Sequence, residues 1–161
     1  MVRTRTVNDR RALAFRTLDD LLADAEALGS GEIRTSGNWT PAQIVEHVGR
    51  LIACSVDGFP KRGSPLIRLV ARLMKKRVLT RPLPAGYPLP GRFAFLEPAP
   101  DATWPEAMEQ LRRAVERAGS ERMSRPSPIL GAMTHEDWVQ FHCRHAEMHF
   151  SFMHPAGEGR S

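Results

Sequence analysis

The sequence of 161 residues contains no long apolar run and little cysteine. A helix that spans a bilayer needs about 20 mostly apolar residues, and no apolar segment of the signal-peptide type follows the charged stretch Met1 to Arg10. The two cysteines, Cys54 and Cys143, lie inside helical patterns and do not form a dense disulfide framework. These absences argue against a membrane-spanning or disulfide-stapled protein, and we expect a cytoplasmic one.

Acidic residues are missing from the whole stretch between Asp57 and Glu97. Cationic residues occur throughout the same stretch, namely Lys61, Arg62, Arg68, Arg72, Lys75, Lys76, Arg77, Arg81 and Arg92. The net charge of +5 raises the question of nucleic acid, because lysine and arginine neutralise phosphates. Aromatic residues interleave poorly with these charges, however, and no helix-turn-helix, zinc-knuckle or RNA-recognition signature accompanies them. A solvated basic face, or a site for an anionic small molecule, therefore explains the stretch better than nucleic-acid binding.

The residues that are present form four amphipathic helical patterns. No low-complexity tract interrupts the chain and 42% of its residues are hydrophobic, so we predict one domain over residues 1–161. The predicted helices run from a cap at Asn8 to Leu28, from Thr40 to near Gly58, from Thr103 to Ser120, and from Thr134 to His154 and Pro155. Thr40 and Thr103 begin capping boxes, while Thr134 and Asp137 cap the last helix. No segment shows the period of a strand.

A long connection joins the second and third predicted helices. Ser64 and Pro65 can start a short basic amphipathic helix that ends at Arg77. Beyond it, regular structure is excluded by the prolines at positions 82, 84, 88, 90, 98 and 100. Long ordered connections are often functional, so we expect this crossover to line or cover a site. Four long helices with one long crossover predict an all-α protein, an antiparallel four-helix bundle.

Histidines lie on the inner faces of the second and the last predicted helix. His145 and His149 are one turn apart, so their side chains share a face with Cβ atoms about 6 Å apart. His142 lies within about 60° of both, and His47 belongs to the apolar stripe of the second helix. Three neutral imidazoles and an open position are the ligand set of catalytic zinc, and imidazole also suits nickel, iron and copper. We predict a divalent metal ion, zinc or nickel first, on His47, His145 and His149.

The neighbouring residues argue against a zinc metalloprotease. That motif needs glutamate directly after the first histidine of the pair, where this chain has Ala146. Glu147 lies about 200° around the helix from His145, and Glu46 about 100° from His47, so neither carboxylate faces the predicted metal. A plainer alternative stays open. A buried neutral imidazole needs only one donor and one acceptor partner, so the histidines can also be core residues.

Several short motifs together resemble the DinB/YfiT-like superfamily of proposed metalloenzymes. They are Asn38-Trp39-Thr40-Pro41 before His47, and the pair His145 and His149 on the last helix. One branch of that superfamily, a domain of unknown function, is the most similar. Its likeness rests on Ser36 to Trp39, Gly58-Phe59-Pro60, the turn from Pro128 to Gly131, and Trp138. The resemblance covers nearly the whole chain and implies an up-down-down-up four-helix bundle, a metal on the three histidines, and a homodimer.

Characterised members of that superfamily are transferases and isomerases that use low-molecular-weight thiols such as bacillithiol or mycothiol. The resemblance implies a metal-dependent enzyme that transfers a thiol to a small electrophile, with metal-dependent hydrolysis as the second choice. A bound metal lowers the pKa of a thiol and so suits this chemistry. Trp39, Trp138 and His142 are expected to line the pocket or to support the ligands. The alternative is a non-enzymatic bundle whose basic crossover, around Leu66 to Met74, binds an acidic partner, nucleic acid or a membrane surface.

Overall fold

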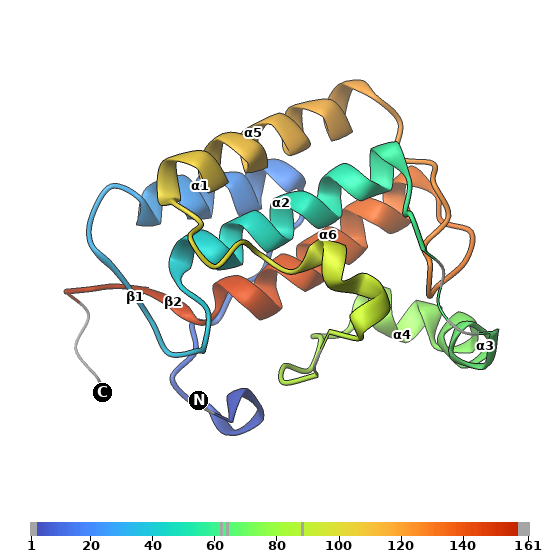
Figure 1. Ribbon diagram of the computed structural model, residues 1–161, viewed down its shortest axis with the longest axis horizontal. Coiled ribbons are helices and arrows are strands. Elements are labelled where there is room, and N and C mark those ends of the chain that lie inside the picture. The colour runs from blue at the N-terminus through green and yellow to red at the C-terminus, as the bar shows by residue number, and fades with distance from the viewer. Residues whose placement is uncertain (1–2, 62, 64, 88, 158–161) are drawn as a thin grey trace.

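A computed structural model of the protein describes residues 3–61, 63, 65–87 and 89–157, and these are mostly helical (Figure 1). The α-helices are α1 (Leu18–Leu28), α2 (Pro41–Asp57), α3 (Pro65–Leu73), α4 (Lys75–Thr80), α5 (Trp104–Ser120) and α6 (His135–Phe150). Two 3-10 helices, η1 (Thr4–Thr6) and η2 (Gly91–Leu96), and two short strands, β1 (Ile33–Thr35) and β2 (Met153–Pro155), complete the described elements. Among these helices, none is both long enough and apolar enough to cross a membrane.

Helices α1, α2, α5 and α6 enclose the main hydrophobic core. Each packs against two of the others, in the cyclic order α1, α5, α2, α6. Figure 1 shows α2 between α5 and α6, with α1 behind them. The largest fully buried side chains of the core include Leu21, Ile52, Leu111, Trp138 and Phe150. Each long helix therefore buries its apolar stripe against its two neighbours.

The predicted starts of α2 and α6 are confirmed. The Thr40 hydroxyl accepts the N–H of Gln43, and the Gln43 side chain accepts the N–H of Thr40, which is a complete capping box. The same reciprocal pair joins Thr134 and Asp137. The capping box expected at Thr103 is not formed. The Thr103 hydroxyl donates instead to the Glu106 carboxylate at 2.7 Å, so the Thr103 side chain does not cap a backbone N–H of the helix.

The first helix begins later than the sequence pattern predicts. It starts after Thr17, where Thr17 and Asp20 form a capping box, and not at Asn8. The residues between these two caps lie along the end of α6, where the Arg11 N–H donates to the Ser151 carbonyl at 2.8 Å. Their backbone groups are thus used by α6 and do not form the expected first turns of a helix.

The crossover is more regular than the prolines suggest. The expected single helix is two, α3 and α4, which meet at Met74; its expected start at Ser64 lies outside the described residues. The break turns α4 onto α6, where the Lys75 ammonium donates to Asp137 at 2.6 Å and to the Ala132 carbonyl at 2.7 Å. The helix η2 forms between Pro90 and Pro98, because a proline just before a first turn removes no helical hydrogen bond. Pro88 lies outside the described residues.

A small two-stranded sheet was not expected from the sequence. Helix α6 ends at Phe150, and the chain continues as β2, which pairs antiparallel with β1 so that Ile33 lies opposite Pro155. Three residues a strand are too few to show an alternating pattern. The sheet joins the chain that leads into α2, which carries His47, to the chain that follows α6, which carries His145 and His149.

Candidate metal centre

His47, His145 and His149 lie together, as their helical positions predict. The first comes from α2 and the other two from α6, on successive turns. Each offers one ring nitrogen, and these three atoms all lie within 4.8 Å of one another. The ring centroids of His145 and His149 are 4.5 Å apart, and the His47 ring lies 5.1 Å and 4.7 Å from them. This group of side chains can hold a metal ion.

A backbone carbonyl sets the tautomer of His47. Its Nδ1 lies 2.7 Å from the carbonyl oxygen of Leu96, the last residue of η2. Because a carbonyl can only accept, Nδ1 carries the proton, and the neutral ring has an unprotonated Nε2. That Nε2 lies 3.3 Å from Nε2 of His145. The lone pair of His47 is therefore directed into the cluster.

Burial keeps the three imidazoles neutral. Desolvation is the main cause that lowers the pKa of His47, and it outweighs the hydrogen bond to Leu96, which raises it. Desolvation also holds the pKa of His145 and of His149 well below the ordinary value, and the neighbouring histidines lower both further. Neutral imidazole is the form that binds a metal ion, so the site needs no deprotonation step near neutral pH.

One distance fits a metal ion. Nitrogens that each lie 2.0–2.1 Å from a tetrahedral ion are about 3.3 Å apart, which is the distance between the two Nε2 atoms of His47 and His145. A direct N–H···N hydrogen bond between the two rings is the metal-free alternative.

Aromatic rings hold the histidines in place. Trp39 stacks on His149, with ring centroids 5.5 Å apart and planes inclined by 12°. It also contacts His47 at 4.9 Å. On the opposite side, Phe141 stacks on His145 at 5.9 Å. Trp39, expected at the pocket from the sequence, is therefore in contact with two of the three candidate ligands.

A cavity of about 780 Å³ opens beside the cluster. All three histidines line it, together with a mainly apolar wall that includes Trp39, Ile44, Leu89, Met148 and Phe152. The crossover contributes residues 84–87, 89 and 90, so it lines this cavity. Arg3 to Thr6 form a further wall that the sequence did not indicate, because that segment has no helical or strand pattern. No acidic side chain is among the described residues that line the cavity.

A comparison with known families identifies the chain. A family model described as a protein of unknown function, DUF1569, matches residues 7–156. The chain belongs to the DUF1569 family. The match includes the three clustered histidines and the crossover wall of the cavity. The comparison with curated proteins gave no match, and the comparison with solved structures gave none either.

Two other residues expected near the pocket of this DUF1569 protein lie elsewhere. His142 is fully buried, and its Nε2 lies 3.0 Å from the Ser55 hydroxyl. Its ring stacks on Trp138, whose indole N–H donates to the Arg125 carbonyl at 2.9 Å. Neither His142 nor Trp138 lines the cavity, so the expected pocket role does not hold for them. Burial lowers the pKa of His142 to about 3.

The carboxylate of Glu46 serves the backbone around η2. It is buried, accepts the N–H of Ala99 at 2.8 Å, and pairs with Arg50 at 2.5 Å. Arg50 also donates to the Glu97 carbonyl. These contacts hold in place the segment whose Leu96 carbonyl binds His47. Glu46 points away from the three candidate ligands, as its position on the helix predicts, but its bond to the Ala99 N–H was missed, because that partner is a backbone atom distant in sequence.

The carboxylate of Glu147 is also engaged away from the cluster. It accepts the backbone N–H of Phe15 at 2.6 Å and pairs with Arg144 at 2.5 Å. The bond to Phe15, together with the hydrogen bond from Arg144 to the Phe15 carbonyl, fastens the segment that precedes α1 to α6. Glu147 therefore projects away from the histidine cluster, as its position on the helix predicts.

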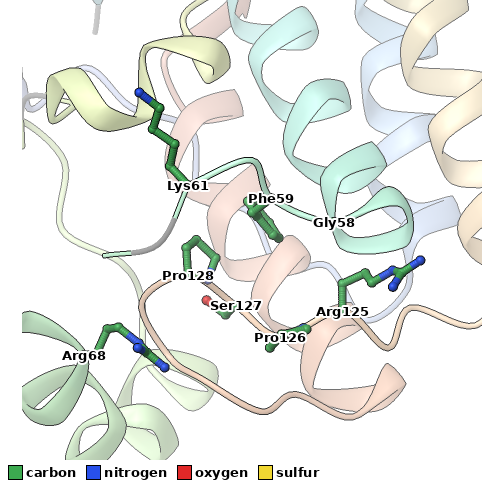
Figure 2. A pocket seen from close by; sticks show the side chains of 8 residues that line it. All are labelled: Gly58, Phe59, Lys61, Arg68, Arg125, Pro126, Ser127 and Pro128. Atoms are coloured by element: carbon green, nitrogen blue, oxygen red, sulfur yellow. The ribbon is translucent and has the colours of Figure 1, made fainter. Parts of the chain in front are cut away.

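A second cavity, of about 380 Å³, lies near the far end of α2 (Figure 2). It is lined by Lys61, Arg68 and Arg125 and by the loop Pro126 to Pro128. Figure 2 shows that only the Arg68 side chain points toward this loop, whereas those of Lys61 and Arg125 point away from it. The three cations do not converge on one point, so this cavity differs from the histidine site in having no focused ligand set.

Proposed function

We propose that this DUF1569 protein is a divalent-metal-dependent enzyme that transfers a low-molecular-weight thiol to a small electrophile. The observation that carries the proposal is the cluster of His47, His145 and His149, with ring nitrogens within 4.8 Å, at the wall of a cavity of about 780 Å³. Zinc or nickel is the proposed ion, because three imidazoles suit both. The cyclic packing of the four long helices supports a bundle of the DinB-like, up-down-down-up type.

Each residue of the site has a role in this proposal. The three histidines hold the ion, the Leu96 carbonyl keeps the proton of His47 on Nδ1, and the stacked rings of Trp39 and Phe141 restrain the imidazoles. When bound, a divalent ion would lower the pKa of a thiol beside it and so supply the thiolate nucleophile. The apolar walls exclude water from that nucleophile.

The lining of the cavity favours thiol transfer over hydrolysis. A thiol has a pKa of about 8.5, so it ionises more readily than water before any metal binds, whereas attack by metal-bound water is assisted by a general base. Glu46 and Glu147 are both engaged with backbone N–H groups and arginines, and no carboxylate is among the described lining residues. Arg3 and Arg5 are the cations of the lining, which favours substrates that carry an anionic group.

The size of the cavity also supports a small substrate. Ligand pockets typically measure about 300–1,000 Å³ and are mostly apolar with a few polar groups. The present cavity lies in that range and has three imidazoles as its convergent polar groups. The family resemblance extends the proposal to a homodimer. The two free cysteines suit the proposed cytoplasmic location, where low-molecular-weight thiols are kept reduced.

Metal analysis of protein purified without an affinity tag tests the proposed site. We expect about one equivalent of divalent metal per chain, and we expect His47→Ala and His145→Ala to lose it, because each removes a ligand. His135→Ala is the matched control, since His135 accepts the Met123 N–H far from the cluster and should leave the metal content unchanged. Metal-free protein that keeps its full stability in chelator would contradict the proposal.

The activity is tested on the metal-loaded protein with a chromogenic aromatic electrophile and a panel of small thiols. We expect product formation that requires both the metal and a thiol and that is lost in His145→Ala. Turnover of an activated ester without any thiol would instead support the metal-dependent hydrolase. A protein that binds metal but catalyses neither reaction would leave the metal a structural role and would contradict the enzyme.

A further inference from the structure

Helix α3 turns its apolar side outward. Its most exposed large apolar residues are Leu66 (72%), Leu69 (60%), Val70 (50%) and Leu73 (81%). On a helix with about 100° per residue, these four side chains fall within a stripe about 100° wide. A helix of a globular protein normally buries such a stripe, and contiguous exposed apolar patches mark interaction surfaces.

The contacts on either side of α3 maintain this orientation. Arg68, on the other face of the helix, points toward the loop Pro126 to Pro128 (Figure 2). The Gly63 N–H, just before the helix, donates to the Pro128 carbonyl at 2.8 Å. After the helix, Lys75 is bound to Asp137 and to the Ala132 carbonyl on α6 and its approach. The helix is therefore attached at both ends with a charged side chain inward and the apolar stripe outward.

The chain segment that carries the stripe has only cationic charges of its own. No acidic residue occurs between Asp57 and Glu97. Arg72, Lys76 and Arg77 are exposed on α3 and α4, and they form no ion pair with any residue in the described part of the chain. An exposed apolar stripe beside cations that form no ion pair fits a partner whose interior is apolar and whose outer layer carries anionic groups.

We propose that α3 docks on an anionic lipid surface. Leu66, Leu69 and Leu73 enter the boundary between headgroups and acyl chains, while exposed lysines and arginines of α3 and α4 contact the lipid phosphates. The helix has nine residues and lies in the plane of the surface without crossing it. None of the residues that line the cavity beside the histidines belongs to the docking face, so this proposal is independent of the proposed enzyme activity.

Two other occupants fit the observations less well. Nucleic acid would use the cations but gives no reason to expose four large aliphatic side chains. A second copy of the chain, paired through the same face of α3, would bring together two cationic segments that contain no acidic residue to offset them. A lipid surface accounts for both the apolar and the cationic component.

Flotation of the full-length protein with vesicles tests this assignment. We expect binding to phosphatidylcholine vesicles that contain phosphatidylglycerol, weaker binding at physiological than at low salt, and little binding to phosphatidylcholine alone. The double variant Leu66→Gln and Leu73→Gln should bind at least about tenfold more weakly, because it removes exposed apolar area. Both positions are exposed, so its melting temperature should match that of the parent protein.

The controls separate the alternatives. Arg72→Gln with Lys76→Gln should weaken binding and reduce its salt dependence, whereas Arg113→Gln, which removes an exposed cation of α5, should change neither. Equal binding to neutral vesicles, or no binding to either kind, would overturn the proposal. So would binding to duplex DNA alone, or a leucine variant that turns a dimer into a monomer and still binds vesicles normally.

Discussion

At the scale of the residue, the interior of this DUF1569 protein contains histidines that have no carboxylate partner, and His142 is the clearest case. His142 is completely buried, contacts the Ser55 hydroxyl, and stacks on Trp138. No carboxylate compensates a positive charge on its ring, so burial alone lowers its pKa, to about 3. The folded protein therefore holds this ring neutral over a pH range in which the unfolded chain protonates it.

This pKa predicts acid sensitivity of the fold. In the unfolded chain, His142 takes up a proton below its ordinary pKa of 6.5. In the folded protein, it is protonated only below about pH 3. Because of this group, the free energy of unfolding should thus fall by up to about 1.4 kcal/mol for each unit by which the pH drops through that window. Urea denaturation of chelator-treated protein at several pH values should show a shallower fall for His142→Gln. Parallel profiles would contradict the assignment.

The candidate ligands were predictable from the sequence because helical periodicity fixes the direction of a side chain around its axis. His47, His145 and His149 lie where their periodicity places them. His142 shares that direction but sits one turn earlier, where α6 meets Ser55 and Trp138 in place of the cavity. Periodicity predicts the direction of a side chain around its helix. It does not predict which residues of a neighbouring helix the side chain meets at its position along the axis.

At the scale of the element, the most extensive helix contact of the core is between α2 and α5. A Cβ atom added at Gly49 of α2 would lie 3.3 Å from Cα and 3.4 Å from N of Leu111 on α5. These are backbone atoms of another helix, so they can yield only if the two helices separate. The absence of a side chain at position 49 therefore sets the distance between α2 and α5.

Gly49→Leu should destabilise the protein by at least about 2 kcal/mol, because it forces the helices apart or the side chain off its rotamer. The matched control is Gly119→Leu on α5, where an added Cβ meets no atom within 4 Å. There the better helix propensity of leucine should leave stability unchanged or raise it by about 0.5 kcal/mol. Chemical denaturation measures both. Similar effects at the two positions would show that Gly49 does not control the packing.

Helix boundaries were predictable where the local signal had no competitor. The caps at Thr40 and Thr134 form as predicted. The helix start expected at Asn8 is not formed. The helix begins after Thr17, because the backbone between these residues contacts the end of α6. The strands β1 and β2 were missed because they are held by a tertiary contact between distant segments, which no local pattern encodes.

At the scale of the whole molecule, the segment before α1 links both ends of the chain. Arg11 makes a bidentate ion pair with Asp24 of α1, at 2.6 and 2.8 Å, and donates to the Met153 carbonyl of β2 at 2.6 Å. Its side chain and that of Asp24 are only 19% and 18% exposed. One guanidinium thus connects the first long helix, the last strand and the chain that leads to the cavity wall at Arg3 to Thr6.

Arg11→Ala should lower the free energy of unfolding by about 2 kcal/mol, since it leaves a half-buried carboxylate and a carbonyl without their partner. Arg112→Ala removes an ion pair with Glu26 that is about half exposed and should change stability by less than about 0.5 kcal/mol. Thermal or urea denaturation at neutral pH compares the two variants. Equal losses would mean that the connection made by Arg11 adds nothing beyond a surface ion pair.

The hydrogen bond between His47 and Leu96 has a consequence for how this family can vary. The acceptor is a main-chain carbonyl, which every amino acid possesses, so substitution at position 96 does not by itself alter the tautomer of His47. Selection on that tautomer instead acts on the residues that place the carbonyl, above all Glu46 and Arg50. Among relatives, we therefore expect position 96 to vary only among residues that fill its buried apolar site with Leu51 and Phe93, while the Glu46–Arg50 ion pair is constrained.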